Sequence, residues 1–248
     1  MSQTSIREKL SRYQQESIAL FRSIPAIAVS LLVVSVVCMN LLANKTIVST
    51  EWLALDGGIL MSWMCFLSMD VIAKHFGPRA ANKVSLLAVL INLLVCLIFK
   101  LVSLIPSEAA DYSEFNTIFG GTWFILLAST IAFIVSAWVN NGLNWSIGQA
   151  FKRNPDGKLA FVTRSYVSTL IGQFIDNLLF AVIVFRFFAP IYWDGFSWTW
   201  LQCVMCALTG ALVELAMEIL FSPIGYAVTK RWRAEGVGQE YLALVAKR

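Results

Sequence analysis

Six long apolar runs restrict this chain more than any other feature of its sequence. The hydrocarbon core of a bilayer is about 30 Å thick, which a helix of about 20 residues spans. The six runs are near that length and are bounded by charged residues, proline or glycine; they cover residues 25–43, 57–73, 84–105, 119–147, 166–190 and 198–228. The sequence therefore predicts an all-α, polytopic integral membrane protein with six transmembrane helices.

The composition of the chain excludes a soluble globular protein. Of the 248 residues, 58% are hydrophobic and only 14% are charged, and the mean hydropathy is +0.71. The net charge of +4 does not indicate nucleic-acid binding, because the basic residues lie in short segments between the apolar runs. The basic N-terminal segment resembles the start of a signal sequence, but no small-residue cleavage signal follows it. We therefore expect the first helix to remain in place.

The distribution of lysine and arginine predicts the orientation. If the N-terminus is cytoplasmic, the outer loops contain only three of the 19 basic residues, namely Lys45, Lys100 and Arg186. The positive-inside rule then places both termini in the cytoplasm. The expected organisation is a cytoplasmic segment over residues 1–23, a transmembrane domain over 24–230 and a cytoplasmic tail over 231–248.

Tryptophans near the predicted span ends are expected to anchor the helices, because amphipathic rings prefer the membrane–water interface. Near the outer boundary are Trp52, Trp123, Trp193, Trp198 and Trp200. Near the inner boundary is Trp232.

Polar side chains inside the spans are the candidate substrate contacts. Burying an amide or a charge in hydrocarbon is costly unless it faces a partner or a water-filled cavity. Gln173, Asp176 and Asn177 are spaced i, i+3 and i+4, so they share one face of the fifth helix. The other candidates are Asn140, Asn141 and Asn144 on the fourth span, Glu214 and Glu218 on the sixth, and Asn92 on the third. For Asn92, a simple bond to a neighbouring helix is the open alternative.

Depth groups some of these residues in one layer. Counted at about 1.5 Å per residue from the inner basic residues, Asp176, Asn140 and Glu218 each lie about 18 Å deep, whereas Glu214 lies at about 24 Å. Alternating-access carriers bind substrate near the midplane. We therefore expect a midplane site in which Glu218 matters more than Glu214, provided that Pro223 does not break the sixth helix. An interhelical network without transport is the alternative.

No cofactor, metal or catalytic motif is expected. The pair Cys203 and Cys206 lies in an apolar run and lacks further metal ligands, and the single histidine, His75, is placed in a basic loop elsewhere. The sequence contains neither H-E-x-x-H nor G-x-S-x-G, which argues against a hydrolase. It has no Walker A loop, so we expect no use of ATP by this chain.

The fifth span resembles a family signature. The segment from Arg164 to Phe180 is similar to R-x-x-x-S-T-x-x-G-Q-x-x-D-x-x-x-F of the vitamin uptake transporter family, whose known members are queuosine precursor transporters. The loop from Met69 to Gly77 and the segment from Ser222 to Tyr226 are similar to two further family motifs, and the resemblance extends over residues 24–232.

The resemblance implies uptake of a deazapurine base, with Gln173 and Asp176 as base contacts. Arg164 and Asp70 are assigned a gating or structural role, although an interfacial ion pair with Lys74 is the simpler reading of Asp70.

The sequence also departs from the family pattern. Asn141 and Asn144 stand where the family has glutamine and aspartate, Lys74 where it has glutamate, and Gly210 where it has lysine, while Glu218 is additional. These departures leave the substrate open between a deazapurine and another nucleobase or vitamin.

The predicted function is transport of a small polar organic molecule across a bacterial inner membrane. The expected partners are this substrate and the lipid bilayer, without nucleic acid. Protons are the simplest energy source, and the oligomeric state, including a homo-oligomer, is not determined. Two alternatives remain: a membrane structural or assembly protein, and a substrate-binding subunit that docks on an energising module through Ala26, Ala28 and Ser30.

Overall fold

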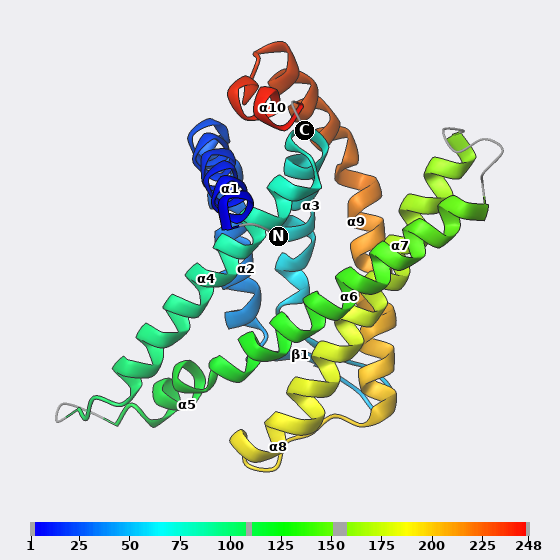
Figure 1. Ribbon diagram of the computed structural model, residues 1–248. Helices are drawn as coiled ribbons and strands as arrows, with labels where there is room; N and C mark the ends of the chain where they lie inside the picture. The colour runs from blue at the N-terminus through cyan, green and yellow to red at the C-terminus, as the bar shows by residue number, and fades with distance from the viewer. Residues whose placement is uncertain (1–2, 108–110, 151–157, 247–248) are drawn as a thin grey trace.

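The computed structural model describes residues 3–107, 111–150 and 158–246, and its architecture is a bundle of long helices (Figure 1). In chain order the elements are α1 (Gln3–Ser23), α2 (Ala26–Leu42), β1 (Thr46–Ser49), β2 (Ala54–Asp56), α3 (Ile59–Phe76), α4 (Pro78–Ser103), α5 (Ser113–Gly121), α6 (Trp123–Ala150), α7 (Lys158–Ala181), the π-helix η1 (Val182–Phe188), α8 (Ala189–Tyr192), α9 (Trp200–Ala234) and α10 (Gln239–Ala246).

The predicted spans are present in the described part of the chain. Five helical stretches, residues 59–76, 78–103, 113–136, 170–192 and 200–221, are long and apolar enough to cross a bilayer. A sixth is obtained when α2 is counted with the end of α1, from which it is bent by 97°. The all-α polytopic membrane class is thus confirmed.

The span boundaries differ from prediction in α7 and α9. Helix α7 begins at Lys158 and, after Ala181, continues as the π-helix η1, which ends just before Pro190. Proline lacks a backbone N–H and cannot continue the regular hydrogen-bond ladder. Helix α9, by contrast, continues through Pro223 to Ala234. Proline inside a membrane helix is tolerated where its surroundings satisfy the freed backbone groups.

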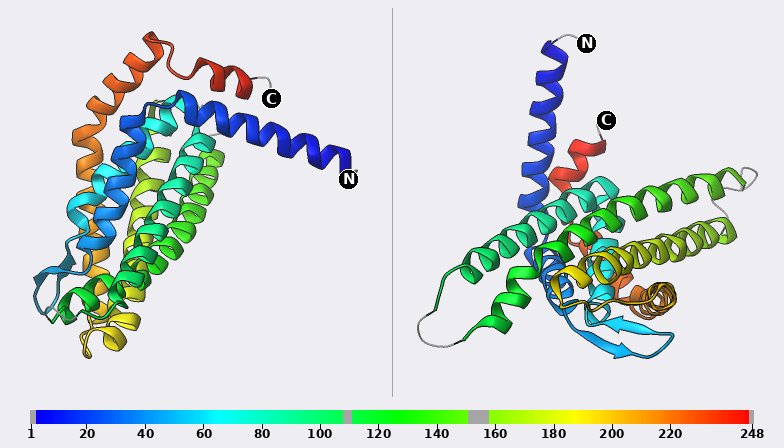
Figure 2. Two further views of the ribbon diagram at one scale, coloured as in Figure 1. Left: turned by 90° about the vertical axis from the view of Figure 1, so that its left-hand side faces the viewer. Right: turned by 90° about the horizontal axis from the view of Figure 1, so that it is seen from below.

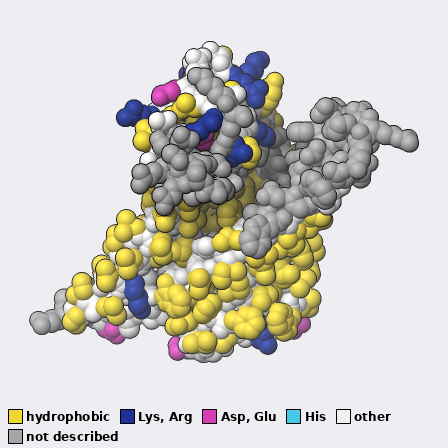
Figure 3. Space-filling model, in the orientation of Figure 1, with side chains coloured by type: hydrophobic (Ala, Val, Ile, Leu, Met, Phe, Trp, Pro, Cys, Tyr) yellow, Lys and Arg dark blue, Asp and Glu magenta, His cyan; other side chains and the backbone are white. Residues whose placement is uncertain are grey.

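The two ends of the bundle differ in structure and charge. The β1–β2 hairpin, α5 and α8 lie at one end, and α1 and α10 lie at the other (Figures 1 and 2). Lysine and arginine side chains gather around α1 and α10, next to a wide apolar band on the helices (Figure 3). The separation of the elements into two ends agrees with the order of loops inferred from the sequence.

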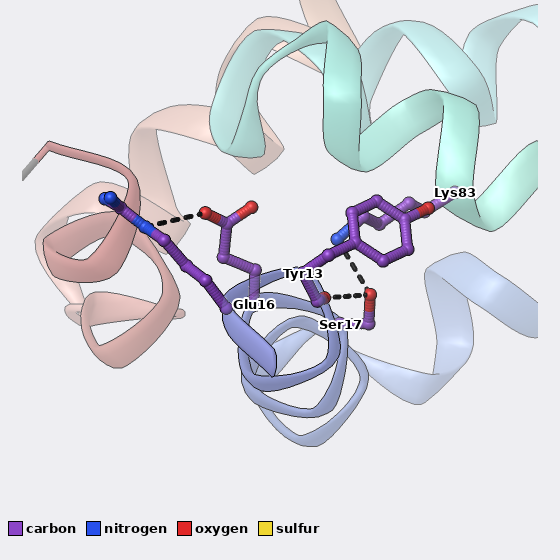
Figure 4. Close-up of polar contacts among 5 residues, drawn as sticks. Tyr13, Glu16, Ser17 and Lys83 are labelled. Carbon is purple, nitrogen blue, oxygen red and sulfur yellow. Dashed lines mark hydrogen bonds and ion pairs between the residues drawn. The ribbon is translucent and has the colours of Figure 1, made fainter. Parts of the chain in front are cut away.

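Helix α1 lies across the end of the bundle instead of crossing it (Figure 2). It packs against α10. The Lys83 ammonium of α4 donates a hydrogen bond to Ser17 Oγ at 2.8 Å and lies 4.1 Å from the centre of the Tyr13 ring (Figure 4). Glu16, 4% exposed, pairs with Arg12 at 3.5 Å. The contacts of Lys83 join α1 to α4, whereas the Arg12–Glu16 pair lies within α1.

Two apolar clusters stabilise opposite ends of the bundle. We call them the inner and outer clusters after the sides of the membrane that their ends of the bundle are predicted to face. The inner cluster joins α1, α2, α3, α4, α9 and α10, and includes Leu20, Ile72 and Tyr241. The outer cluster joins α6, η1, α9 and the hairpin region, and includes Phe124 and Phe185. Within the spans, this packing stabilises the bundle through van der Waals contact, because lipid chains are as apolar as the side chains themselves.

Two predicted interfacial anchors belong to these clusters instead. Trp198, only 1% exposed, stacks on Phe185 with 3.8 Å between ring centres. Trp232 is buried beside His75, at 5.4 Å between ring centres. His75 itself lies in the last turn of α3 and not in a loop, and its Nε2 is 2.9 Å from the carbonyl oxygen of Val237. Packing against a second helix therefore overrides the preference of these rings for the interface.

The turn between α3 and α4 requires a glycine. Gly77 has a φ of 88°, a conformation that side-chain-bearing residues rarely adopt. The next residue, Pro78, starts α4, where its missing N–H costs no hydrogen bond. The glycine of the loop motif therefore has a geometric role.

The β1–β2 hairpin was not expected from the sequence. Asp56 pairs with Thr46 across the two strands, and its Oδ1 accepts a hydrogen bond from the Gly58 N–H at 2.7 Å. Burial raises the pKa of Asp56 from 3.8 to about 6, although the bond from Gly58 partly offsets this effect.

The orientation can be tested by thiol labelling in intact cells, in a background without the native cysteines. Single cysteines at Ser49, Ser113 and Ser197 should react with an impermeant reagent, because these residues lie at the end predicted to face outward. A cysteine at Lys158 should react only after the membrane is permeabilised. Labelling of the Lys158→Cys variant in intact cells would show that the orientation is wrong.

Asp56 predicts a pH-dependent difference in stability. Its folded pKa lies above its unfolded value, so the protonated carboxyl stabilises the fold at low pH, and this contribution is lost as the pH rises from about 4 through about 6. One pKa unit corresponds to about 1.4 kcal/mol, so the loss amounts to about 3 kcal/mol.

The Asp56→Asn variant keeps an acceptor for Gly58 and should not show this loss. The measurement is the thermal unfolding midpoint of both proteins in detergent across this pH range. Parallel pH curves for the two proteins would contradict the interpretation.

Candidate functional site

The site is built on the contact between α7 and α9. Small residues on one face of α9, among them Cys203, Ala207 and Ala211, are fully buried and allow α7 to approach. The packing is tight at Gly210, where an added Cβ would lie only 2.8 Å from the Asn177 Nδ2. Glycine at 210, where the family resemblance led us to expect lysine, therefore creates the space for the Asn177 amide.

Asp176 is held from the neighbouring helix α6. Ser136 Oγ donates a hydrogen bond to Asp176 Oδ1 at 2.8 Å. The same hydroxyl lies 3.1 Å from the Phe133 carbonyl oxygen, so its single proton can serve only one acceptor at a time. In the described part of the chain, no second side-chain donor contacts this half-buried carboxylate. Asp176 thus retains capacity to accept hydrogen bonds from a ligand.

Glu214 of α9 lies beside Asp176 and is more deeply buried. Glu214 is only 5% exposed. The Asn177 Nδ2 donates a hydrogen bond to the Glu214 Oε2 at 3.4 Å, which is long for such a bond. The Ser62 hydroxyl of α3 also reaches this carboxylate, and the Asp176 and Glu214 carboxylates interact electrostatically. Cys65 of α3 interacts with both. Among the described residues, neutral groups from α3, α6 and α7 therefore lie next to the carboxylates of two helices.

The depth estimated for Glu214 from its sequence distance to the inner basic residues was wrong. The count put Glu218 level with Asp176 and Glu214 one turn farther out, yet Glu214 bonds to the residue adjacent to Asp176. The count started from basic residues, but α7 begins before Arg164 and α9 extends beyond Lys230, so these residues do not mark equal levels. The side chain of Glu218 lies outside the described residues, and its relative importance stays a prediction.

Several other predicted residues cannot be placed in the cluster. The side chains of Asn140, Asn141, Asn144, Asp70 and Arg164 lie outside the described residues.

Gln173 and Asn92 are described, and their positions differ. Gln173 is half-buried one turn before Asp176 on the same face of α7, so it lines the same side of the helix. Asn92 is 1% exposed on α4, whose neighbours are mainly α2, α3, α5 and α6. A role of Asn92 in substrate binding stays a prediction.

The sequence did not show which hydroxyl groups contact the carboxylates. Ser136 recurs with Asn140 and Asn144 every four residues on the fourth span and is a polar candidate there, but its contact with Asp176 comes from the structure. Ser62 stands alone in an apolar run, and single serines are too common in membrane helices to indicate a site. Only the packing of α3, α6 and α7 around α9 identifies these two contacts.

The proposed docking patch for an energising module is not a continuous surface. Ala26 and Ser30 are exposed on α2, whereas Ala28 is buried in the inner cluster. The three small side chains therefore do not form one face on which another protein could pack.

The chemistry of the cluster favours binding over catalysis or metal coordination. Carboxylates accept hydrogen bonds, and amides and hydroxyls both donate and accept them. Within the described residues, no group of three His, Cys, Asp or Glu side chains could hold a metal ion. A multi-pass helical bundle with such a polar cluster between its spans is the arrangement of a membrane transporter.

Comparison with known families agrees with this class. The family model described as "Putative vitamin uptake transporter" matches residues 56–228, which is more than half of the chain. The protein belongs to the vitamin uptake transporter family. The matched range contains all the described members of the cluster. Neither the curated proteins nor the solved structures compared with the chain give a match.

The close contact at Gly210 predicts a coupled pair of substitutions. Gly210→Ala places a methyl group against the Asn177 amide and should lower stability by about 1–3 kcal/mol, as overpacking does. In an Asn177→Ala background the methyl group has space, so Gly210→Ala should be nearly neutral there. Thermal unfolding midpoints of the four proteins in detergent measure this coupling.

Gly121→Ala serves as the control, because a Cβ there meets Phe124 at an ordinary 3.5 Å. An equal loss of stability for Gly210→Ala in both backgrounds would contradict the assigned contact.

Proposed function

We propose that this transporter takes up a deazapurine queuosine precursor, or a closely related nucleobase, across a bacterial inner membrane. The single observation that supports the proposal is the meeting of Asp176, Asn177 and Glu214 between two spans, with Gln173 one turn away on the same face. The family membership supports uptake as the direction of transport.

The hydrogen-bonding capacity of the cluster fits a purine-like ring. Two carboxylates accept N–H groups, and the amides of Gln173 and Asn177 add both a donor and an acceptor. A flat base presents adjacent N–H and carbonyl groups along its edge, which such side chains can contact together. A site that hydrogen-bonds its substrate strongly rejects analogues that leave its polar groups unpaired.

The charge of the cluster argues against anionic substrates. In the described part of the chain, no lysine or arginine contacts Asp176 or Glu214. A vitamin that carries a carboxylate or phosphate would meet two acidic side chains without a compensating cation, at a high electrostatic cost. The site therefore selects neutral or cationic molecules rich in N–H donors.

The test uses binding of 7-deazaguanine, the ring of the proposed substrate class, to purified protein. Binding is measured as ligand-dependent thermal stabilisation and compared with common nucleobases and with carboxylated vitamins. We expect stabilisation by 7-deazaguanine and none by the anionic vitamins. Stabilisation by the anionic vitamins alone would overturn the proposal.

Substitution of Asp176 then locates the site. Asp176→Asn replaces an acceptor oxygen by a donor, so a bound N–H would face another N–H and lose roughly 1–3 kcal/mol, or about ten- to a hundredfold in affinity. Asp176→Leu should lose at least as much binding while the protein still inserts, because leucine is stable in hydrocarbon.

The matched control is Asp111→Asn, which changes an exposed aspartate at the hairpin end of the molecule. The yield of monodisperse protein is measured for every variant. Unchanged binding by Asp176→Asn, or lost yield as the only effect of Asp176→Leu, would show that Asp176 is structural.

A further inference from the structure

The two carboxylates of the site cannot both carry a charge without compensation. Asp176 and Glu214 lie on adjacent helices and interact electrostatically. Two like charges in a medium of low dielectric constant repel each other strongly, and each also loses its hydration. In the described part of the chain, their hydrogen-bond partners Ser136, Asn177 and Ser62 are neutral, so binding of a proton or another cation would stabilise the pair.

The hydrogen bonds distinguish the two carboxylates. Asp176 accepts a short bond of 2.8 Å from a hydroxyl group, an interaction that stabilises the ionised carboxylate. Glu214 has a long contact of 3.4 Å with Asn177 and is 5% exposed, so its charge is less well compensated. Both serine hydroxyls also lie near a backbone carbonyl oxygen, Ser136 at 3.1 Å and Ser62 at 3.2 Å, so the difference rests on the Asn177 contact and on burial. Hence a proton binds more favourably to the Glu214 carboxylate than to the Asp176 carboxylate.

Among the residues whose side chains are described, the remaining ionisable groups around Glu214 do not supply a positive charge. From α3, Cys65 faces both carboxylates, and from α9 itself Cys206 interacts with Glu214 and with Asp56 of the hairpin. Arg186 of η1 acts on Cys203 and stacks over Trp200 at 5.7 Å, farther toward the hairpin end. The side chains of Asp70 and Glu218 are acidic and lie outside the described residues.

We propose that Glu214 carries the proton that couples transport to the proton gradient, while Asp176 contacts the substrate. This inference rests on the proposed function and adds the energy source of the same site. The uptake cycle then moves one proton with each substrate molecule. The Glu214 carboxylate takes up a proton from the outer solution, the substrate binds at Asp176, and both are released to the inner solution.

Asn177 and Ser62 fit this role because they tolerate both states of Glu214. An amide and a hydroxyl can donate to a carboxylate, and they can also accept from a protonated carboxyl group after a rotation. Such partners keep the side chain in place through a cycle of protonation, whereas a lysine or arginine would hold it ionised.

The first experiment detects the proton without any substrate. Infrared spectra of the protein in lipid vesicles at pH 7 should contain the C=O stretch of a buried protonated carboxyl group. This band should be missing in Glu214→Gln and retained in Glu240→Gln, which alters an exposed glutamate of α10. A carboxyl band that is identical in wild type and Glu214→Gln would overturn the proposal.

The second experiment measures transport of tritiated 7-deazaguanine by proteoliposomes. If one proton accompanies each substrate, an imposed gradient of one pH unit, alkaline inside, should drive about tenfold accumulation in wild type. Glu214→Gln should lose this accumulation yet still exchange external for internal 7-deazaguanine, because exchange needs no net movement of protons. Glu240→Gln should behave as wild type.

The outcomes separate this inference from the proposed function. Exchange without gradient-driven accumulation in wild type, or full accumulation in Glu214→Gln, would overturn proton coupling and leave the substrate assignment intact. Absence of both binding and exchange of 7-deazaguanine in wild type would overturn the substrate assignment. In that case the infrared band still decides whether Glu214 holds the proton.

Discussion

The cost of placing polar groups in a bilayer determines the arrangement of the central helices. No water in the hydrocarbon core can compensate a buried carboxylate, so Asp176 and Glu214 must find partners on other spans. Ser136 of α6 and Asn177 of α7 are two of these partners. The small residues of α9 allow the helices to come close enough for such bonds, and Gly210 leaves room for the Asn177 side chain. The close packing of these helices therefore also provides the hydrogen bonds that the buried polar side chains need.

The apolar clusters complete this arrangement. The inner cluster fixes α1 and α10 against the ends of α3 and α4, and the outer cluster joins α6 and η1 to the hairpin region and the start of α9. On α9, Cys206 is in the outer cluster and Trp232 in the inner one, and Glu214 lies between them. The polar cluster therefore lies between the two apolar clusters, and Cys65 of the inner cluster and Cys206 of the outer cluster border it. A carrier that exposes a central site alternately to its two sides needs packing at both ends and a polar centre.

The structure also explains why residues of one type differ in role. Trp198 and Trp232 were expected at the membrane interface, but both are buried because aromatic and imidazole rings from other elements pack on them. Glu214 and Glu218 are one helical turn apart, and sequence distance from the basic residues favoured Glu218. The bond from Asn177 places Glu214 next to Asp176, whereas the side chain of Glu218 lies outside the described residues. Such distinctions depend on the relative heights and tilts of helices, which a count along one helix does not contain.

The sequence by itself determined the membrane class and helices long enough to span a bilayer, five in the structure or six when α2 is counted with the end of α1, because hydrophobic length is a local property of a chain. It also determined that Gln173, Asp176 and Asn177 share one face. Only the tertiary structure decided which residues of other helices meet that face, namely Ser136 and Glu214, with Ser62 behind Glu214. The physical reason is that contacts between helices depend on how closely and at what level their backbones pack, and a single small residue such as Gly210 sets that distance.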